Sequence, residues 1–155
     1  MLNNIKNADN DMQVYDLWSE AFGDTNEDIK FFLENCNHKT CVGYYKNKRL
    51  VSMLFLVDCS VHGIKSKYVY AACTLKSCRS LGLMTKILDY CKSNNDNICL
   101  IPANDTLIDY YDKREFSIKV SINDIKFSET DEIKEYLLEG YALSEPCALM
   151  YKGDK

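Results

Sequence analysis

The sequence has 155 residues, of which 46% are hydrophobic and 27% charged, and this predicts one folded domain spanning 1–155. The 19 Lys and Arg residues are outnumbered by 23 Asp and Glu residues, giving a net charge of −4. This balance argues against nucleic acid or an anionic membrane as the main partner, because both need a basic face, and it leaves room for a cationic substrate. The apolar run 51–57 is far shorter than the roughly 20 residues that cross a bilayer. Residues 1–10 are polar and carry no signal sequence, so we expect a cytoplasmic protein.

Two amphipathic helices are predicted at the start of the chain. Apolar residues recur at i, i+3, i+4 and i+7 within 10–22, which is typical of a helix that buries one face. Gly23 follows, as glycine often does at a helix C-terminus. Thr25 with Asp28 three residues later resembles a capping box, and an apolar stripe over 29–36 predicts the second helix.

The period then changes to that of β-structure. The runs 41–45 and 50–57 are rich in strand-forming residues and are separated by the polar connection 46–49. A third such run covers 68–74. These three segments predict a meander of antiparallel strands.

The rest of the chain alternates helix and strand, which predicts an α+β fold with a mixed sheet. Pro102 ends a buried strand, because proline cannot donate to a ladder. Asn104 and Asp105 are both good N-caps for the helix that follows. The predicted helices cover 82–93, 104–113 and 128–139, and the predicted strands cover 98–101, 116–122 and 147–151.

The eight cysteines are expected to be reduced structural thiols. Most lie inside apolar runs, where cysteine behaves as a small hydrophobic residue, and a disulfide framework needs a secretory context. The nearest approach to a metal cluster is Cys36 and Cys41 with His38 between them. Zinc needs four converging ligands, so no metal is expected.

The segment from strand 68–74 into helix 82–93 has the character of an anion site. Backbone N–H groups at the start of a helix have no intrahelical partner, and the helix dipole adds positive potential there. Arg79 adds a side chain that can fork onto phosphate oxygens, and Gly82 lets the backbone approach closely. Neither the P-loop pattern nor the dinucleotide fingerprint is present. Taken alone, the segment also fits an ordinary turn with a surface arginine.

A second element, at 102–116, makes the pattern specific. Two motifs match Arg79 and Gly82, in the loop pattern (Q/R)-x-x-G-x-(G/A), and Asn104, Tyr111 and Phe116, in a segment like A-N-x-x-x-x-x-F-Y-x-K-x-G-F. With these motifs the sequence resembles the GNAT superfamily of acetyl-CoA-dependent N-acetyltransferases. The resemblance implies a three-layer fold. Its central, mostly antiparallel mixed sheet has six to seven strands flanked by helices, and its fourth and fifth strands splay apart to admit the cofactor.

The resemblance also implies the site. Acetyl-CoA is the expected cosubstrate, and the acetyl group passes directly to a primary amine of a small molecule or peptide. Tyr111 is the expected general acid, which protonates the departing thiolate. A homodimer through the last strands is common in such proteins. The residues expected to bind the cofactor are Ala72, Cys73, Thr74, Arg79, Ser80, Leu81, Gly82, Leu83, Met84, Thr85 and Asn104.

Several alternatives stay open at this stage. Spacing alone does not separate Tyr111 from its neighbour Tyr110. The base that deprotonates the amine is a water chain or a carboxylate such as Asp58 or Glu145, unless the amine arrives neutral. A thiol mechanism through Cys73 lacks an activating base nearby in sequence. The alternative function is an acyl-CoA-binding sensor or scaffold of the same fold without turnover. Arg114 departs from the family pattern, which usually has a small apolar residue there.

Overall fold

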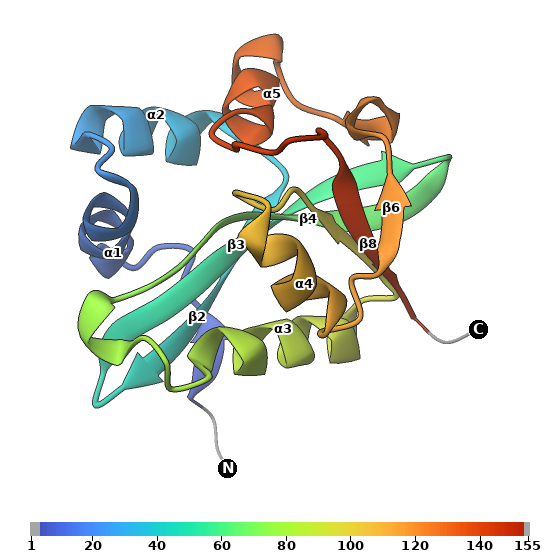
Figure 1. Cartoon of the computed structure of the whole chain (residues 1–155). Coiled ribbons are helices and arrows are strands. Elements are labelled where there is room, and N and C mark those ends of the chain that lie inside the picture. Colours follow the sequence, from blue (N-terminus) through green and yellow to red (C-terminus); the bar gives the residue numbers. More distant parts are fainter. Residues whose placement is uncertain (1–3, 154–155) are drawn as a thin grey trace.

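The structure is a computed structural model that describes residues 4–153. Within this range, five α-helices surround one eight-stranded sheet (Figure 1). The helices are α1 (Gln13–Phe22), α2 (Asn26–Asn35), α3 (Leu83–Asn94), α4 (Thr106–Asp112) and α5 (Asp131–Leu138). The strands are β1 (Ile5–Asn7), β2 (Lys39–Lys46), β3 (Arg49–Val61), β4 (Ile64–Thr74), β5 (Asn97–Leu100), β6 (Ile118–Val120), β7 (Ile125–Phe127) and β8 (Ala148–Lys152).

The two N-terminal helices form as their sequence predicts. Gly23 ends α1 in a left-handed conformation, with φ of 74°, and its N–H donates to the Ser19 carbonyl. Thr25 caps α2, because its hydroxyl accepts a hydrogen bond from the Asp28 N–H at 3.1 Å. Both predicted helix boundaries are confirmed at this junction.

The sheet order is β1-β2-β3-β4-β5-β8-β6, and β7 pairs with β3. The antiparallel meander β2-β3-β4 is confirmed. A crossover through α3 makes β5 parallel to β4, and β8 returns antiparallel to β5. This is the predicted mixed, mostly antiparallel sheet.

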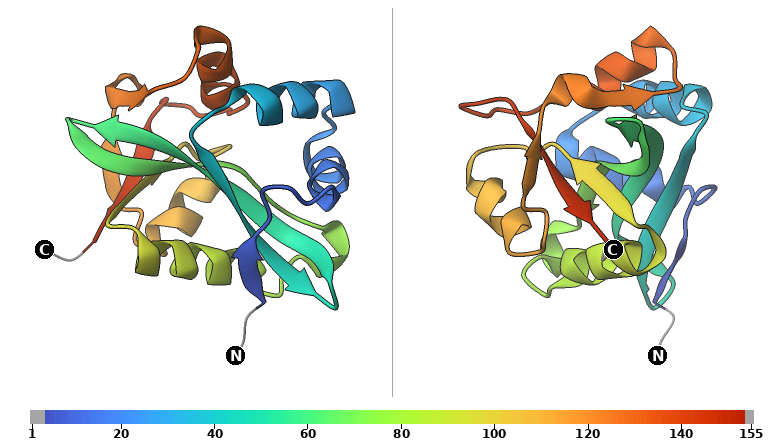
Figure 2. Two further views of the ribbon diagram at one scale, coloured as in Figure 1. Left: turned by 180° about the vertical axis from the view of Figure 1, so that it is seen from behind. Right: turned by 90° about the vertical axis from the view of Figure 1, so that its right-hand side faces the viewer.

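Helices cover both faces of the sheet, which accounts for the unbroken apolar run on β3. Trp18 of α1 packs on Phe55 with ring centroids 5.5 Å apart, on one face. Lys86 of α3 lies over the Tyr44 ring at 5.9 Å, on the other face. All residues of 50–57 are buried, as expected for a strand between two helical layers. Figure 2 shows α3 on the opposite side of the sheet from α2 and α5.

The structure differs from the sequence prediction in its shortest elements. The strands β1 and β7 have three residues each, too few to show an alternating pattern, and they raise the number of strands to eight. The predicted strand 116–122 is shortened to β6, and a 3₁₀ turn at Ile122–Asp124 leads into β7. In residues 4–153 no helix is long and apolar enough to cross a membrane.

The predicted side-chain cap of α4 is wrong. Asp105 is the N-cap residue, but its side chain makes no capping hydrogen bond. Its carboxylate instead accepts hydrogen bonds from the N–H and the hydroxyl of Ser144, which ties the start of α4 to the segment before β8. Long-range pairing has replaced the local cap.

Candidate active site

A cleft opens where β4 and β5 separate. These strands pair only at Lys67–Ile98 and Tyr68–Cys99, although β4 continues to Thr74. Within the described residues, β4 beyond Tyr68 therefore has no strand partner on its β5 side. Buried backbone N–H and C=O groups need partners, so this edge suits an extended, amide-containing ligand.

A β-bulge shapes the same stretch of β4. Phe55 pairs with Tyr70 and Met53 pairs with Cys73, so Ala71 and Ala72 together oppose a single residue of β3. Ala71 has φ of 55°, in the left-handed region that residues other than glycine seldom occupy. A bulge bends its strand, and here the bend falls at the mouth of the cleft.

The cleft contains a cavity of about 370 Å³. Its walls come from β4, the segment after β5, α4, and the C-terminal ends of α1 and α5 (Figure 1). The lining residues are Trp18, Phe22, Asp24, Tyr68, Val69, Tyr70, Ala71, Ala72, Leu100, Ile101, Ala103, Leu107, Tyr111, Tyr136, Leu137, Glu139, Gly140 and Tyr141.

Tyr111 reaches this cavity from α4. Its ring packs edge-on against Phe116 at 6.1 Å, and its hydroxyl has no hydrogen-bond partner among residues 4–153. Burial raises the pKa of Tyr111 to about 12, Tyr110 adds to the rise, and the Arg114 cation opposes it. The phenol is therefore protonated at neutral pH and able to donate.

The structure separates Tyr111 from Tyr110, which spacing alone did not. Tyr110 is absent from the cavity lining. Its ring instead carries the Arg114 guanidinium at 3.5 Å from the centroid, a cation–π contact. Only Tyr111 of the pair faces the cleft.

The predicted anion loop lies between β4 and α3. Ser80 and Gly82 have φ of 68° and 76°, and Gly82 is the N-cap of α3. No side chain in the described part of the chain caps this helix, so the first-turn amides of Leu83, Met84 and Thr85 have no side-chain acceptor there. Ser80, Leu81 and Gly82 are exposed. The loop thus presents uncapped donors at an accessible helix start, which is the requirement for holding a diphosphate.

The side chains of Arg79 and Thr85 form hydrogen bonds with other residues of the protein. The Arg79 Nε donates to the Thr74 carbonyl at 3.0 Å, which folds the side chain back along the end of β4. The Thr85 hydroxyl accepts from the Arg114 Nε at 2.9 Å. The guanidinium of Arg114 also donates to the Tyr110 carbonyl at 2.7 Å. This one side chain therefore connects the start of α3 to the helix that carries Tyr111.

Of the predicted strand residues, Ala72 lines the cavity, whereas the side chains of Cys73 and Thr74 do not. Cys73 is buried, and burial raises the pKa of its thiol to about 12, so the thiol is protonated at neutral pH. The Thr74 hydroxyl lies 2.7 Å from the Ser52 hydroxyl. Their carbonyls also have partners, because the Cys73 carbonyl accepts a hydrogen bond from the Ser52 hydroxyl and the Thr74 carbonyl accepts one from the Arg79 Nε.

Asn104 lies beside the cleft and not in its lining. Its side-chain oxygen accepts a hydrogen bond from the Thr106 hydroxyl, and its backbone forms a parallel bridge with Ala142. Asn104 therefore steadies the segment that leads into α4, next to the lining residue Ala103.

The carboxylates at the cavity are not those considered from the sequence. Asp58 forms an ion pair with Lys67, and neither it nor Glu145 lines the cavity. Asp24 and Glu139 line it instead. Both follow helices at loop positions, and no motif in the sequence marks them.

Comparisons with known proteins show the family of this chain. A sequence profile of the acetyltransferase (GNAT) domain matches residues 4–118, so the chain belongs to the GNAT acetyltransferase family. No functionally curated protein matches the sequence.

Solved structures share the fold at low sequence identity. A GNAT family acetyltransferase from Elizabethkingia anophelis with acetyl-CoA bound has a TM-score of 0.60 and 11% identity, covering 97% of this chain and 99% of that one. N-acetylglutamate synthase from Neisseria gonorrhoeae has a TM-score of 0.58 and 8% identity, over 99% of this chain and 35% of that one. A protein of unknown function from Enterococcus faecalis has a TM-score of 0.51 and 19% identity, over 63% of this chain. The chain spans 28% of the Enterococcus protein.

Proposed function

We propose that this chain transfers the acetyl group of acetyl-CoA to a primary amine, with Tyr111 as the general acid. The observation that carries the proposal is the unpartnered, protonated phenol of Tyr111 in a cavity between the diverging strands β4 and β5. The Elizabethkingia protein of the same fold has acetyl-CoA bound, which supports this cosubstrate.

Two features of the described residues fit acetyl-CoA. The free edge of β4 at Ala72, Cys73 and Thr74 suits an amide-containing arm, and the uncapped start of α3 suits a diphosphate. In this assignment the segment 79–85 holds the phosphates, with the amides of Leu83 to Thr85 as donors. Acetyl-CoA supplies an activated thioester.

The residues of the chain then have distinct tasks. Binding both reactants in one cleft removes the entropic cost of their encounter, which accounts for much of the acceleration in such reactions. The amine nitrogen forms its bond to the thioester carbon as the carbon–sulfur bond breaks. The Tyr111 hydroxyl gives its proton to the departing sulfur, and the proton lost by the amine goes to solvent. Tyr111 is suited to this task because its side chain lines the cavity and its hydroxyl is protonated at neutral pH.

Thiol release from acetyl-CoA, measured against a panel of primary amines, tests the proposal. Tyr111→Phe removes only the hydroxyl, and we expect kcat to fall by about 100-fold or more, in the range for loss of a general acid. Tyr110→Phe is the matched control and retains activity, because its ring does not line the cavity. Binding of acetyl-CoA with no thiol release for any amine overturns the proposal in favour of an acyl-CoA-binding sensor.

A further inference from the structure

We propose that the acceptor is a small diamine, whose second, protonated amino group is held by Asp24 and Glu139 while the first is acetylated. This inference rests on the proposed function and adds the substrate class. The two carboxylates belong to the same cavity as Tyr111.

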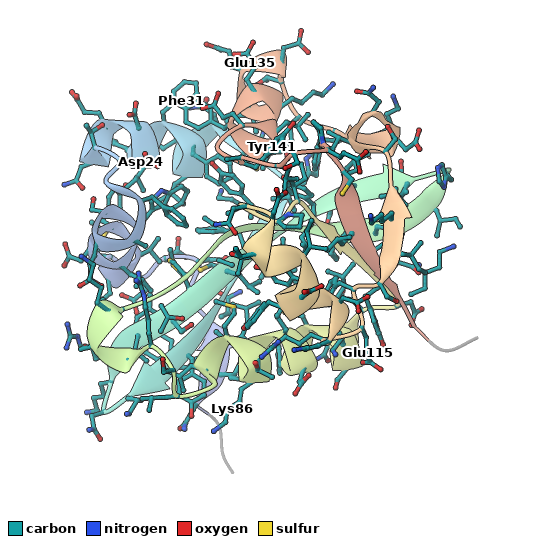
Figure 3. All side chains as sticks on the ribbon, viewed as in Figure 1. Asp24, Phe31, Lys86, Glu115, Glu135 and Tyr141 are labelled. Carbon is teal, nitrogen blue, oxygen red and sulfur yellow. The ribbon has the colours of Figure 1, made fainter. Side chains whose placement is uncertain are left out.

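Asp24 and Glu139 approach the cavity from two different helices. Asp24 follows the left-handed turn at Gly23 that ends α1, and Glu139 is the C-cap of α5. Asp24 lies between α1 and α2 (Figure 3). The pKa of the Tyr70 phenol is raised mainly by burial, and the negative charges of Asp24 and Glu139 raise it further. Their negative charges therefore converge on one region of the cavity wall.

This negative charge is not balanced within the described part of the chain. Asp24 accepts a hydrogen bond from the Trp18 indole N–H at 2.9 Å, but no Lys, Arg or His of residues 4–153 forms an ion pair with it. Glu139 has neither a hydrogen bond nor an ion pair within the same residues. Among the lining residues that the structure describes, none has a cationic side chain. Carboxylates left unpaired beside a partly apolar cavity favour a cationic ligand.

Aromatic rings complete the surroundings of a cation. Trp18, Tyr70, Tyr136 and Tyr141 line the cavity together with the two carboxylates. Trp18 and Tyr70 pack against each other with centroids 5.9 Å apart. Ring faces attract ammonium groups, and the attraction increases where water is excluded. Carboxylates and rings therefore select for the same charge.

The reaction itself indicates why the ligand has two amino groups. An alkyl amine has a pKa near that of lysine, about 10.4, and must lose its proton before it can attack a thioester. The attacking nitrogen is uncharged at that moment, so it gives the carboxylates no cation to hold. A second amino group that remains protonated gives the carboxylates a cation to hold. The unpartnered phenol of Tyr111 marks the reacting end of the cavity, and the two carboxylates mark the binding end.

The test compares kcat/KM for 1,4-diaminobutane, 1-aminobutane and 4-aminobutanoate, which share a four-carbon chain and differ in the charge at the far end. We expect the wild type to prefer the diamine over the monoamine by at least tenfold, and to use the anionic amine least. The preference for the diamine decreases as ionic strength rises, because exposed charges are screened.

Two substitutions remove the charges with little change of shape. Asp24→Asn keeps an oxygen that can accept the Trp18 N–H, and Glu139→Gln alters a side chain with no partner. Each should reduce the diamine-to-monoamine ratio of kcat/KM by about tenfold. Glu135→Gln, on the same helix but absent from the cavity lining (Figure 3), should leave the ratio unchanged.

The outcomes distinguish this inference from the proposed function. Equal use of diamine and monoamine by the wild type, or a ratio unaffected by both substitutions, refutes the diamine while leaving acetyl transfer intact. Absence of thiol release with any amine refutes the proposed function itself. A thermal shift of each variant with acetyl-CoA, matching that of the wild type, establishes that a changed ratio does not come from a damaged fold.

Discussion

At the α3 end of the cleft, the groups available to a ligand are backbone amides, held in place by left-handed residues at Ser80 and Gly82. At the α1 and α5 end they are side chains, the carboxylates of Asp24 and Glu139 among aromatic rings. Backbone amides suit the part of the ligand that all reactions at such a site share, because the positions of the amides depend on backbone conformation and not on residue identity. Side chains recognise what distinguishes one acceptor from another. Under the proposed function, the two ends therefore divide binding of the common donor from selection of the acceptor.

The largest effect that tests this division is expected at Gly82. A β-carbon built on Gly82 meets nothing within 4 Å, so the glycine is required by its φ of 76° and not by lack of space. Gly82→Val forces a residue into a region that costs L-amino acids about 1–2 kcal/mol, and the loop shifts to escape it. We expect the affinity for acetyl-CoA to fall by about tenfold, measured by calorimetry.

A matched control is Gly82→Asn, because asparagine tolerates the left-handed region better than valine does. It should retain most of the affinity. The diamine-to-monoamine ratio should be the same in both variants and in the wild type, since the acceptor end is untouched. Undiminished binding by Gly82→Val would show that the conformation of this loop is not needed for the donor.

This difference between the two ends also explains why one end could be predicted from the sequence and the other could not. The loop at Gly82 is contiguous with the strand before it and the helix after it, so its role follows from a short motif and from helix-terminus physics. Asp24 and Glu139 are 115 positions apart in the chain and meet only through the packing of α1 and α5 around β4. Carboxylates at the ends of surface helices are common, and nothing local marks these two.

The long helices and strands were predictable because their apolar patterns are local in the sequence. The short strands were not predictable in this way. The apolar period of α3 is a local property, as is the unbroken run of β3. The strands β1 and β7 exist because a neighbouring edge is available to pair with, at Tyr44 and at Cys59 respectively. Asp105 likewise meets Ser144 through tertiary packing that its local sequence does not encode.

A smaller effect is expected at Arg114, which connects the start of α3 to α4, the helix that carries Tyr111. Its guanidinium joins the Thr85 hydroxyl to the Tyr110 carbonyl and lies on the Tyr110 ring. Removing these contacts in Arg114→Ala loosens α4 relative to α3, and Tyr111 is no longer held firmly against the donor. The side chain is partly exposed, so we expect a loss of about 1 kcal/mol, or roughly fivefold in kcat.

Arg114→Lys separates charge from geometry, because lysine keeps the cation but lacks the planar fork that reaches two acceptors. We expect it to resemble the alanine variant in kcat, with KM for acetyl-CoA changed less than kcat in both. A lysine variant with full activity would mean that the positive charge near Tyr111, and not the connection between helices, is what matters.

The smallest effect is expected at Cys73, which lies on β4 between the two ends. Because burial raises the pKa of its thiol to about 12, the thiolate fraction at neutral pH is very small. Cys73→Ala should therefore keep kcat within about twofold, and the folded wild type should react slowly with iodoacetamide at this residue, as followed by mass spectrometry. At pH 9 the thiol is still mostly protonated, so alkylation stays slow, and its rate keeps rising with pH without reaching a plateau, since that pH is still well below the raised pKa. Rapid, activity-destroying alkylation of Cys73 would contradict direct transfer and make the thiol a carrier of the acetyl group. The expected inertness follows from the burial of this side chain, which is not part of the cavity lining.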